Sequence, residues 1–177
     1  MSTVRENESA RQTFAELYEE YLPKVYRYIN YRINDTQITE DLTSTVFEKV
    51  LTNFGKYSKD RASFSTWLFS ISRNVVIDYY RAQGRKQTVS LDETTEVVSR
   101  NLSPEEELLK KEEREKLQVY LMELPQDEQE IIRLKFAAEL NNRQIARMLG
   151  LSESNVGTKL YRSIRKLRDV FQESENG

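Results

Sequence analysis

The stretch NNRQIARMLGLSESNVGTKLYRSIRKLRDVF, residues Asn141–Phe171, decides the fold of the C-terminal part of this chain. Asn141 can cap a short helix, with Gln144 at its third helical position, and Gly150 can adopt the left-handed conformation that ends a helix. Ser152 can then cap a longer helix whose apolar residues recur at helical spacing. Two helices joined by a glycine turn predict a helix-turn-helix.

The second of these helices is predicted to have an apolar inner face and a basic outer face. Its expected inner residues are Val156, Leu160, Ile164, Leu167 and Phe171. The expected DNA-contacting residues are Ser152, Asn155, Thr158, Lys159, Arg162, Arg165 and Lys166. Arginine can pair with guanine edges in the major groove, and lysine or serine can hold phosphates. The basic bias, the glycine turn and the short capped helix favour DNA binding over an ordinary charged helix surface.

The composition restricts the class of protein. The formal net charge is −2, and 32% of residues are charged while few are glycine or proline, which is typical of a helical protein. Cysteine and histidine are both absent, which excludes disulfides, Cys/His metal sites and Ser–His or Cys–His catalytic pairs. A metal site built from carboxylates alone stays open at this point, but no acidic residues have the spacing of a Ca²⁺-binding loop. We expect no catalysis, cofactor, metal or small-molecule substrate. No apolar run reaches the roughly 18 residues of a membrane span, so we expect a cytoplasmic protein without membrane insertion.

Two helices are predicted at the start of the chain. Apolar residues recur every three or four positions over residues 13–33, where Pro23 should kink or split the helix. Thr39 is the expected N-cap of the next helix, and Gly55 is expected to end it. The apolar stripe of that second helix is Leu42, Val46, Phe47, Val50, Leu51 and Phe54.

A third helix and a linker follow. Ser63 can cap a helix that stops near Gly84. Residues 85–102 are polar and lack helical periodicity, so we interpret them as a flexible linker. Ser103-Pro104 then signals a new helix, because a capping serine precedes proline at the first helical position.

The last part of the pattern sets the domain organisation. Leu124-Pro125 should break the helix that starts at Ser103, and a further helix should cover residues 126–139. Nothing alternates with the period of a strand. The sequence therefore predicts an all-α protein of two small helical domains, residues 12–84 and 103–172, joined by a flexible linker. The second domain ends in the helix-turn-helix.

A second basic segment, residues 56–86, interleaves aromatic and basic side chains. This combination suits single-stranded nucleic acid, because unstacked bases need an aromatic face or pocket and the backbone needs cations. Helical spacing also places most of these aromatic residues in the core, and Trp67 is expected there. Tyr57, on the predicted loop, is the better candidate for a base contact.

Four segments in order resemble bacterial RNA polymerase sigma factors of the extracytoplasmic-function class. They are ITEDLTSTVFEKVL, FSTWLFSISRNVVIDYYR, LPQDEQEIIRLKF and the helix-turn-helix stretch. The resemblance implies a dissociable, non-catalytic subunit that directs promoter-specific initiation. Its partners would be core RNA polymerase, through the clamp helices of the largest subunit and the flap of the second-largest subunit, promoter DNA, and an anti-sigma factor.

The resemblance also implies roles for individual residues. The core-polymerase contact would involve Asp41, Ser44, Thr45 and Glu48, although the family often has Gln-Glu where this chain has Ser44-Thr45. The helix-turn-helix would read the −35 element. The reader of the melted −10 strand would comprise Lys56, Tyr57, Lys59, Arg61, Arg73, Asn74, Asp78 and Arg81.

The alternative is an autonomous helix-turn-helix regulator that binds duplex DNA as a dimer. Such a regulator has no need of the second basic segment with its loop aromatic, and gel filtration would separate the two hypotheses. A helical enzyme has little support, because no glycine-rich phosphate loop can be placed.

Overall fold

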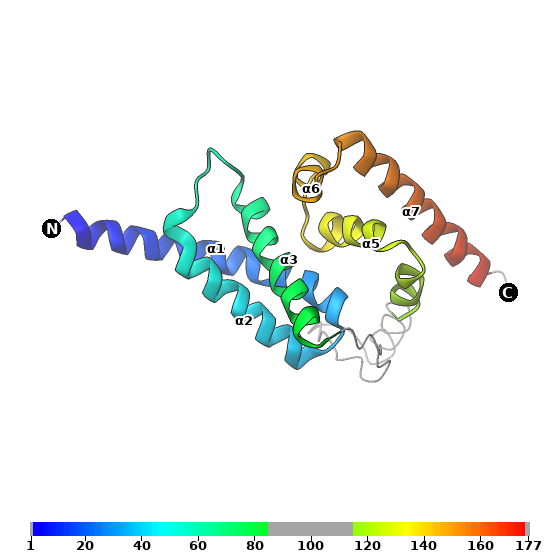
Figure 1. The fold of residues 1–177 in the computed structure, drawn as a ribbon, viewed down its shortest axis with the longest axis horizontal. Coiled ribbons are helices and arrows are strands. Elements are labelled where there is room, and N and C mark those ends of the chain that lie inside the picture. The colour runs from blue at the N-terminus through cyan, green and yellow to red at the C-terminus, as the bar shows by residue number, and fades with distance from the viewer. Residues whose placement is uncertain (1, 85–114, 176–177) are drawn as a thin grey trace. The chain divides into compact units, whose positions relative to one another are not determined.

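The computed structural model describes residues 2–84 and 115–175, and the chain divides into two compact units, Met1–Glu93 and Thr94–Gly177 (Figure 1). The described residues form helices and turns with no strand among them, which confirms the all-α prediction and the two helical domains. The predicted linker, 85–102, and the predicted helix start at Ser103 lie outside the described residues.

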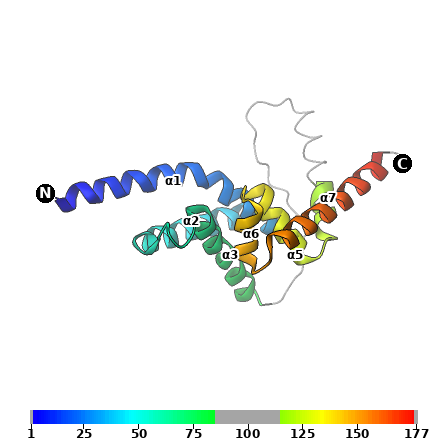
Figure 2. The same ribbon diagram turned by 90° about the horizontal axis from the view of Figure 1, so that it is seen from above.

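The first unit consists of three long helices, α1 (Ser2–Ile33), α2 (Thr36–Asn53) and α3 (Phe64–Ala82), with a 3-10 turn η1 (Phe54–Lys56) after α2. Helix α2 packs against both α1 and α3 (Figures 1 and 2). The fully buried side chains of the three helices form one core: Val25, Tyr28, Ile29, Val46, Val50, Leu68, Phe69 and Val76. The Tyr28 and Phe69 rings meet edge to face at the centre, 5.6 Å apart.

Helix α1 passes through Pro23 as one helix, so of the two effects expected of that proline, a kink or a split, the split is wrong. Proline removes a single backbone donor, whose acceptor would be the carbonyl of Glu19. Glu19 and Pro23 both lie on the exposed side of α1, where water can satisfy that carbonyl. The buried side chains Val25 and Ile29 hold the rest of the helix against the core.

The start of α2 also differs from the prediction. Asp35, and not Thr39, is its N-cap, with the carboxylate accepting a 2.8 Å hydrogen bond from the Ile38 amide. Thr39 is buried one turn further on, and its hydroxyl bonds the side chain of Asn30 in α1. The helix ends at Asn53, shortly before the expected Gly55. Ser63 caps α3 as predicted.

The second unit consists of a helical segment at 115–122, then α5 (Gln126–Ile132), a π-helical turn η2 (Arg133–Ala137), α6 (Asn142–Leu149) and α7 (Glu153–Glu175). The break at Leu124-Pro125 is confirmed. The predicted helix over 126–139 widens into the π turn and ends at Ala137. Glu139 has a φ of 58°, so the chain turns there through the left-handed region. The fully buried side chains Ile131, Leu134, Ile145 and Val156 join these helices in a core of their own.

No helix in the described ranges is both long enough and apolar enough to cross a membrane.

Candidate nucleic-acid interface

The helix-turn-helix forms as the sequence predicts. The Asn141 side chain accepts from the Gln144 amide at 2.9 Å, and the Gln144 side chain accepts from the Asn141 amide at 2.9 Å, which is a complete capping box. Gly150 ends α6 with a φ of 67°. The Ser152 hydroxyl then accepts from the Asn155 amide at 3.1 Å and caps α7. These local bonds fix where the two helices begin and end.

Helix α7 is rotated relative to the predicted inner face. Val156 and Leu160 are buried as expected, but the next inward residue is Ser163, which is 0% exposed. Ile164, which was expected inside, is 37% exposed, so that prediction is wrong. The reason is a polar partner: the Ser163 hydroxyl donates a 2.8 Å hydrogen bond to the buried Glu128 carboxylate of α5.

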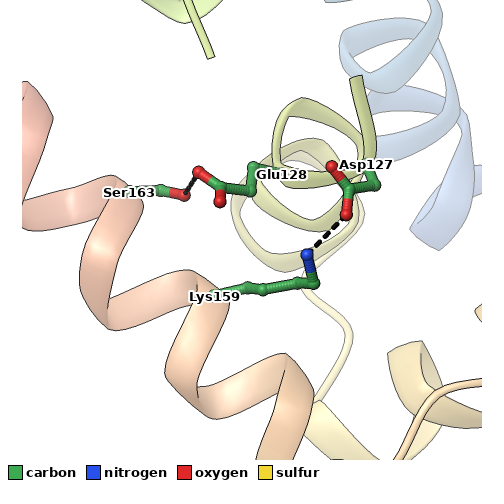
Figure 3. Close-up of polar contacts among 4 residues, drawn as sticks. All are labelled: Asp127, Glu128, Lys159 and Ser163. Carbon is green, nitrogen blue, oxygen red and sulfur yellow. Dashed lines mark hydrogen bonds and ion pairs between the residues drawn. The ribbon is translucent and has the colours of Figure 1, made fainter. Parts of the chain in front are cut away.

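Lys159 is turned toward α5, where it forms an ion pair with Asp127 at the edge of the helix interface. Its ammonium is 2.5 Å from the Asp127 carboxylate of α5, and its side chain is 25% exposed (Figure 3). The hydrogen bond with Lys159 holds the pKa of Asp127 below its usual value. The Asp127 carboxylate already neutralises the charge of Lys159. A contact between Lys159 and DNA stays a prediction, and it would require this ion pair to open.

The other predicted −35 residues do lie on the exposed side of α7. They are Ser152, Asn155, Thr158, Arg162, Arg165 and Lys166. Tyr161 was not among the predicted residues, and its side chain is 68% exposed beside Arg162. A signal was present, because an aromatic residue one position after an inward leucine points away from the helix interface. Together these residues form a basic surface with one large aromatic ring.

In the first unit, the loop 57–63 between η1 and α3 projects away from the three helices (Figure 1). Lys59 and Arg61 are exposed on this loop, and Lys56 is exposed just before it. Tyr57 is half-buried: its ring stacks at 5.1 Å on Trp67, and its hydroxyl donates to the Ala62 carbonyl at 3.2 Å. Burial raises the pKa of the Tyr57 phenol. The ring thus helps to hold the loop on α3, and Trp67 is half-buried and not fully in the core.

The predicted −10 residues of α3 have different exposures. Asn74, Asp78 and Arg81 are exposed, and Asp78 forms a 3.6 Å ion pair with Arg81. Arg73 is half-buried. One turn of the helix separates Asn74 from Asp78, so these two side chains lie on the same side of α3. The structure brings this set and the basic loop residues into one unit, separate from the surface of α7.

The predicted polymerase-contact residues lie along α2. Asp41, Ser44 and Glu48 are exposed, whereas Thr45 is half-buried and donates to the Asp41 carbonyl at 2.9 Å. Leu51 was expected in the apolar stripe but is 59% exposed, which corrects that prediction. Residues 44, 48 and 51 are spaced by four and three, so Leu51 extends the polar surface with an apolar side chain.

Within the described ranges, no group of three acidic side chains is placed to hold a metal ion. The exposed side chains of α7 and of the loop 57–63 offer positive charge, which suits contacts to phosphates and base edges.

Two family models match this chain: sigma-70 region 2 matches residues 17–86, and sigma-70 region 4 matches residues 114–167. The ECF sigma factor SigX of Bacillus subtilis is 32% identical over 89% of this chain and 82% of its own length. The ECF sigma factor BldN of Streptomyces coelicolor is 32% identical over 87% of this chain, which spans only 58% of the length of BldN.

A similar solved structure is the sigma factor RpoE of Bartonella quintana, which was solved in complex with the anti-sigma factor NepR. The likeness has a TM-score of 0.69 at 19% sequence identity, and it covers 91% of this chain and 98% of the RpoE chain. At that identity the likeness shows the fold alone. Neither family match supports the alternative of an autonomous dimeric regulator. With both regions matched in order, and with SigX aligned over most of its length, the chain belongs to the sigma-70 family of RNA polymerase sigma factors, in the extracytoplasmic-function class.

Proposed function

We propose that this chain directs promoter-specific initiation with two separate DNA-reading surfaces, one on each unit. The observation that carries the proposal is the exposed basic side of α7, the second helix of a capped helix-turn-helix, in a chain whose other unit carries a basic loop. The formal net charge of −2 supports dependence on a partner, because overall acidity weakens binding of the free chain to DNA.

The surface of α7 suits duplex DNA at the −35 element. The second helix of a helix-turn-helix lies in the major groove. Arg162 and Arg165 are exposed there, and an arginine can form two hydrogen bonds to one guanine. Thr158 and Asn155 are shorter exposed donors and acceptors on the same helix, suited to phosphates or base edges.

The first unit suits the melted −10 strand. Lys56, Lys59 and Arg61 are exposed cations around the loop, and they support backbone contacts to a single strand. Asn74 is exposed on α3 and can bond the edge of an unstacked base. Tyr57 contributes to this surface by holding the loop through its contacts with Trp67 and Ala62.

The exposed side of α2 is the proposed docking surface for core polymerase, through the clamp helices of its largest subunit. Asp41, Ser44 and Glu48 supply polar and acidic groups, and Leu51 adds an exposed apolar side chain near the end of the helix. A polar surface with one apolar anchor is typical of a protein–protein contact. Family membership also supports contact with the flap of the second-largest subunit, an anti-sigma factor as a further partner, and action in the cytoplasm.

The test uses a promoter selected from random duplexes by holoenzyme reconstituted with this chain. Binding and open-complex yield are measured on the duplex and on the same promoter with a pre-melted −10 bubble. We expect Arg165→Ala to weaken duplex binding by about 1–3 kcal/mol and to relax the preference at one base pair, while capture of the bubble stays intact. Asn74→Ala should leave −35 docking nearly normal and reduce bubble capture.

Lys116→Ala serves as the control, because Lys116 is an exposed cation of the second unit outside the helix-turn-helix. If Arg165→Ala reduced only bubble capture, or if Asn74→Ala reduced only duplex binding, the two surfaces would be assigned to the wrong DNA elements. Equal effects of Arg165→Ala and Lys116→Ala on duplex binding would show that α7 does not read the −35 element.

A further inference from the structure

Two neighbouring carboxylates of α5 hold α7 at two points one helical turn apart. Asp127 pairs with Lys159 at 2.5 Å, and Glu128 accepts from the Ser163 hydroxyl at 2.8 Å (Figure 3). Lys159 and Ser163 are four residues apart and so lie on the same side of α7. The two contacts are called here the α5 clamp.

The α5 clamp selects one rotation of α7 about its axis. Neighbouring residues of a helix differ in direction by about 100°, given 3.6 residues per turn. A helix that buried Ile164 in place of Ser163 would therefore be turned far enough to separate Ser163 from Glu128. A buried carboxylate is costly without a hydrogen-bond partner, so the Glu128–Ser163 bond opposes that rotation.

The rotation decides whether Lys159 is available on the outer side of α7. Arg162 and Arg165 are exposed in this rotation, and Tyr161 is 68% exposed beside them. Lys159 is turned toward α5, where the Asp127 carboxylate neutralises its charge. The charge on the outer side of α7 is thus lower than the sequence alone indicates.

We propose that Asp127 and Glu128 are positioning residues for the DNA-reading helix: they fix the rotation of α7 and keep Lys159 turned toward α5 and away from DNA, while Arg162 and Arg165 stay outside. This inference rests on the proposed role of α7 in reading duplex DNA. Neither carboxylate needs to touch DNA for it to hold. Asp127 acts through Lys159, and Glu128 acts through Ser163.

The first test measures how the affinity of the full chain for a mixed-sequence duplex of about 20 base pairs falls with salt, since each phosphate contact adds about 0.9 to the logarithmic slope. Lys159→Met keeps the aliphatic stem and removes the charge, and it should leave the slope unchanged. Arg165→Met should lower the slope by about 0.9. A fall with Lys159→Met equal to that with Arg165→Met would overturn the proposal.

The same assay tests whether Asp127 withholds Lys159. Asp127→Asn should release the ammonium and steepen the slope by about 0.9 relative to Glu123→Gln. Glu123→Gln is the matched control, because Glu123 is an exposed acid of the same unit and the change in net charge is identical. Equal slopes for these two variants would show that Asp127 does not keep Lys159 from DNA.

The second test separates positioning from simple stabilisation. Glu128→Gln and Glu128→Leu change the charge equally, but only glutamine retains an acceptor for the Ser163 hydroxyl. Glu128→Gln should keep the wild-type unfolding temperature and salt slope. Glu128→Leu should steepen the slope by about 0.9 relative to Glu128→Gln even where circular dichroism shows a folded chain, because a rotated α7 carries Lys159 away from Asp127 and leaves its charge free for a phosphate. A wild-type slope in folded Glu128→Leu would leave only a structural role and would overturn the proposal.

Ser163→Ala removes the donor and serves as the second variant if Glu128→Leu does not fold, with the same expected steepening of the slope. A wild-type slope for it would equally overturn the proposal. Failure of the proposed function looks different: Arg165→Met would then leave the slope at the wild-type value. In that outcome α7 does not bind duplex DNA, and the inference that Asp127 and Glu128 position it for DNA is wrong as well.

Discussion

Gly150 gives a stability prediction whose size follows from its backbone conformation. The residue ends α6 with a φ of 67°, and a Cβ built there would meet nothing within 4 Å. Any cost of Gly150→Ala therefore comes from conformation and not from a clash. An L-residue in the left-handed region costs roughly 1–2 kcal/mol. Alanine also restricts the unfolded chain, which offsets about 0.4–1 kcal/mol of that cost.

The net expectation for Gly150→Ala is a loss of about 1 kcal/mol, or about 4–8 °C in the unfolding temperature of a domain this small. Gly55→Ala is the matched control, because a Cβ there also meets nothing within 4 Å and its φ is not positive. Gly55→Ala should be neutral or should stabilise by up to about 1 kcal/mol. The two variants differ mainly in φ.

The assay follows unfolding with two probes. Trp67, the single tryptophan, lies in α3 and reports the first unit, whereas far-UV circular dichroism reports both units. Gly150→Ala should lower the transition seen by dichroism and leave the tryptophan transition in place. If Gly150→Ala and Gly55→Ala had the same effect on their own units, conformational strain at Gly150 could not be the cause, and the reasoning would be refuted.

Three further predictions concern other parts of the chain. Glu139→Gly should stabilise the second unit by about 0.5–1 kcal/mol, because Glu139 occupies the left-handed region at a φ of 58°. Thermal unfolding measures the change, and an unchanged unfolding temperature would contradict the prediction. The lowered pKa of Asp127 means that its ion pair contributes stability above its usual pKa of 3.8 and loses it as the pH falls through the lowered value. Wild type and Asp127→Asn should therefore differ in urea midpoint at neutral pH and converge in stronger acid, and a constant difference would be evidence against the pair. Asp41→Lys or Glu48→Lys should reduce co-purification with core polymerase and leave the dichroism spectrum unchanged, because both side chains are exposed on α2. Normal co-purification would show that the docking surface lies elsewhere.

The helix-turn-helix was predictable because its signals are local. The bonds between Asn141 and Gln144, and between Ser152 and Asn155, each join residues three positions apart. Gly150 needs no partner to favour the left-handed region. Such features can be recognised in a short window of sequence, and the structure has all of them.

The rotation of α7 was not predictable in the same way. Ser163 is buried because of Glu128, 35 positions earlier, and Lys159 is occupied by Asp127, 32 positions earlier. An apolar pattern necessarily prefers Ile164 to a serine at the interface. Only the packing of α5 against α7 shows that a buried polar pair replaces the apolar contact.

The errors in the first unit have similar causes. Asp35 and Thr39 are both good capping residues, and the choice between them depends on the buried contact of Thr39 with Asn30. Leu51 fits an apolar stripe by spacing, yet it is exposed. Periodicity gives the direction of a side chain along a helix but does not tell how far the neighbouring helix covers it.

The separate cores of the two units have an evolutionary consequence. Val46 and Leu68 belong to one core, while Ile131 and Val156 belong to the other, so a substitution that alters packing in one unit leaves the folding of the other intact. If the outer residues of α7 choose the promoter and the α2 surface docks on polymerase, as proposed, selection can change the first to suit a new set of genes while the second stays as it is. Recombination can exchange whole halves between paralogues. A lineage can acquire new regulatory programmes in this way without rebuilding its transcription machinery.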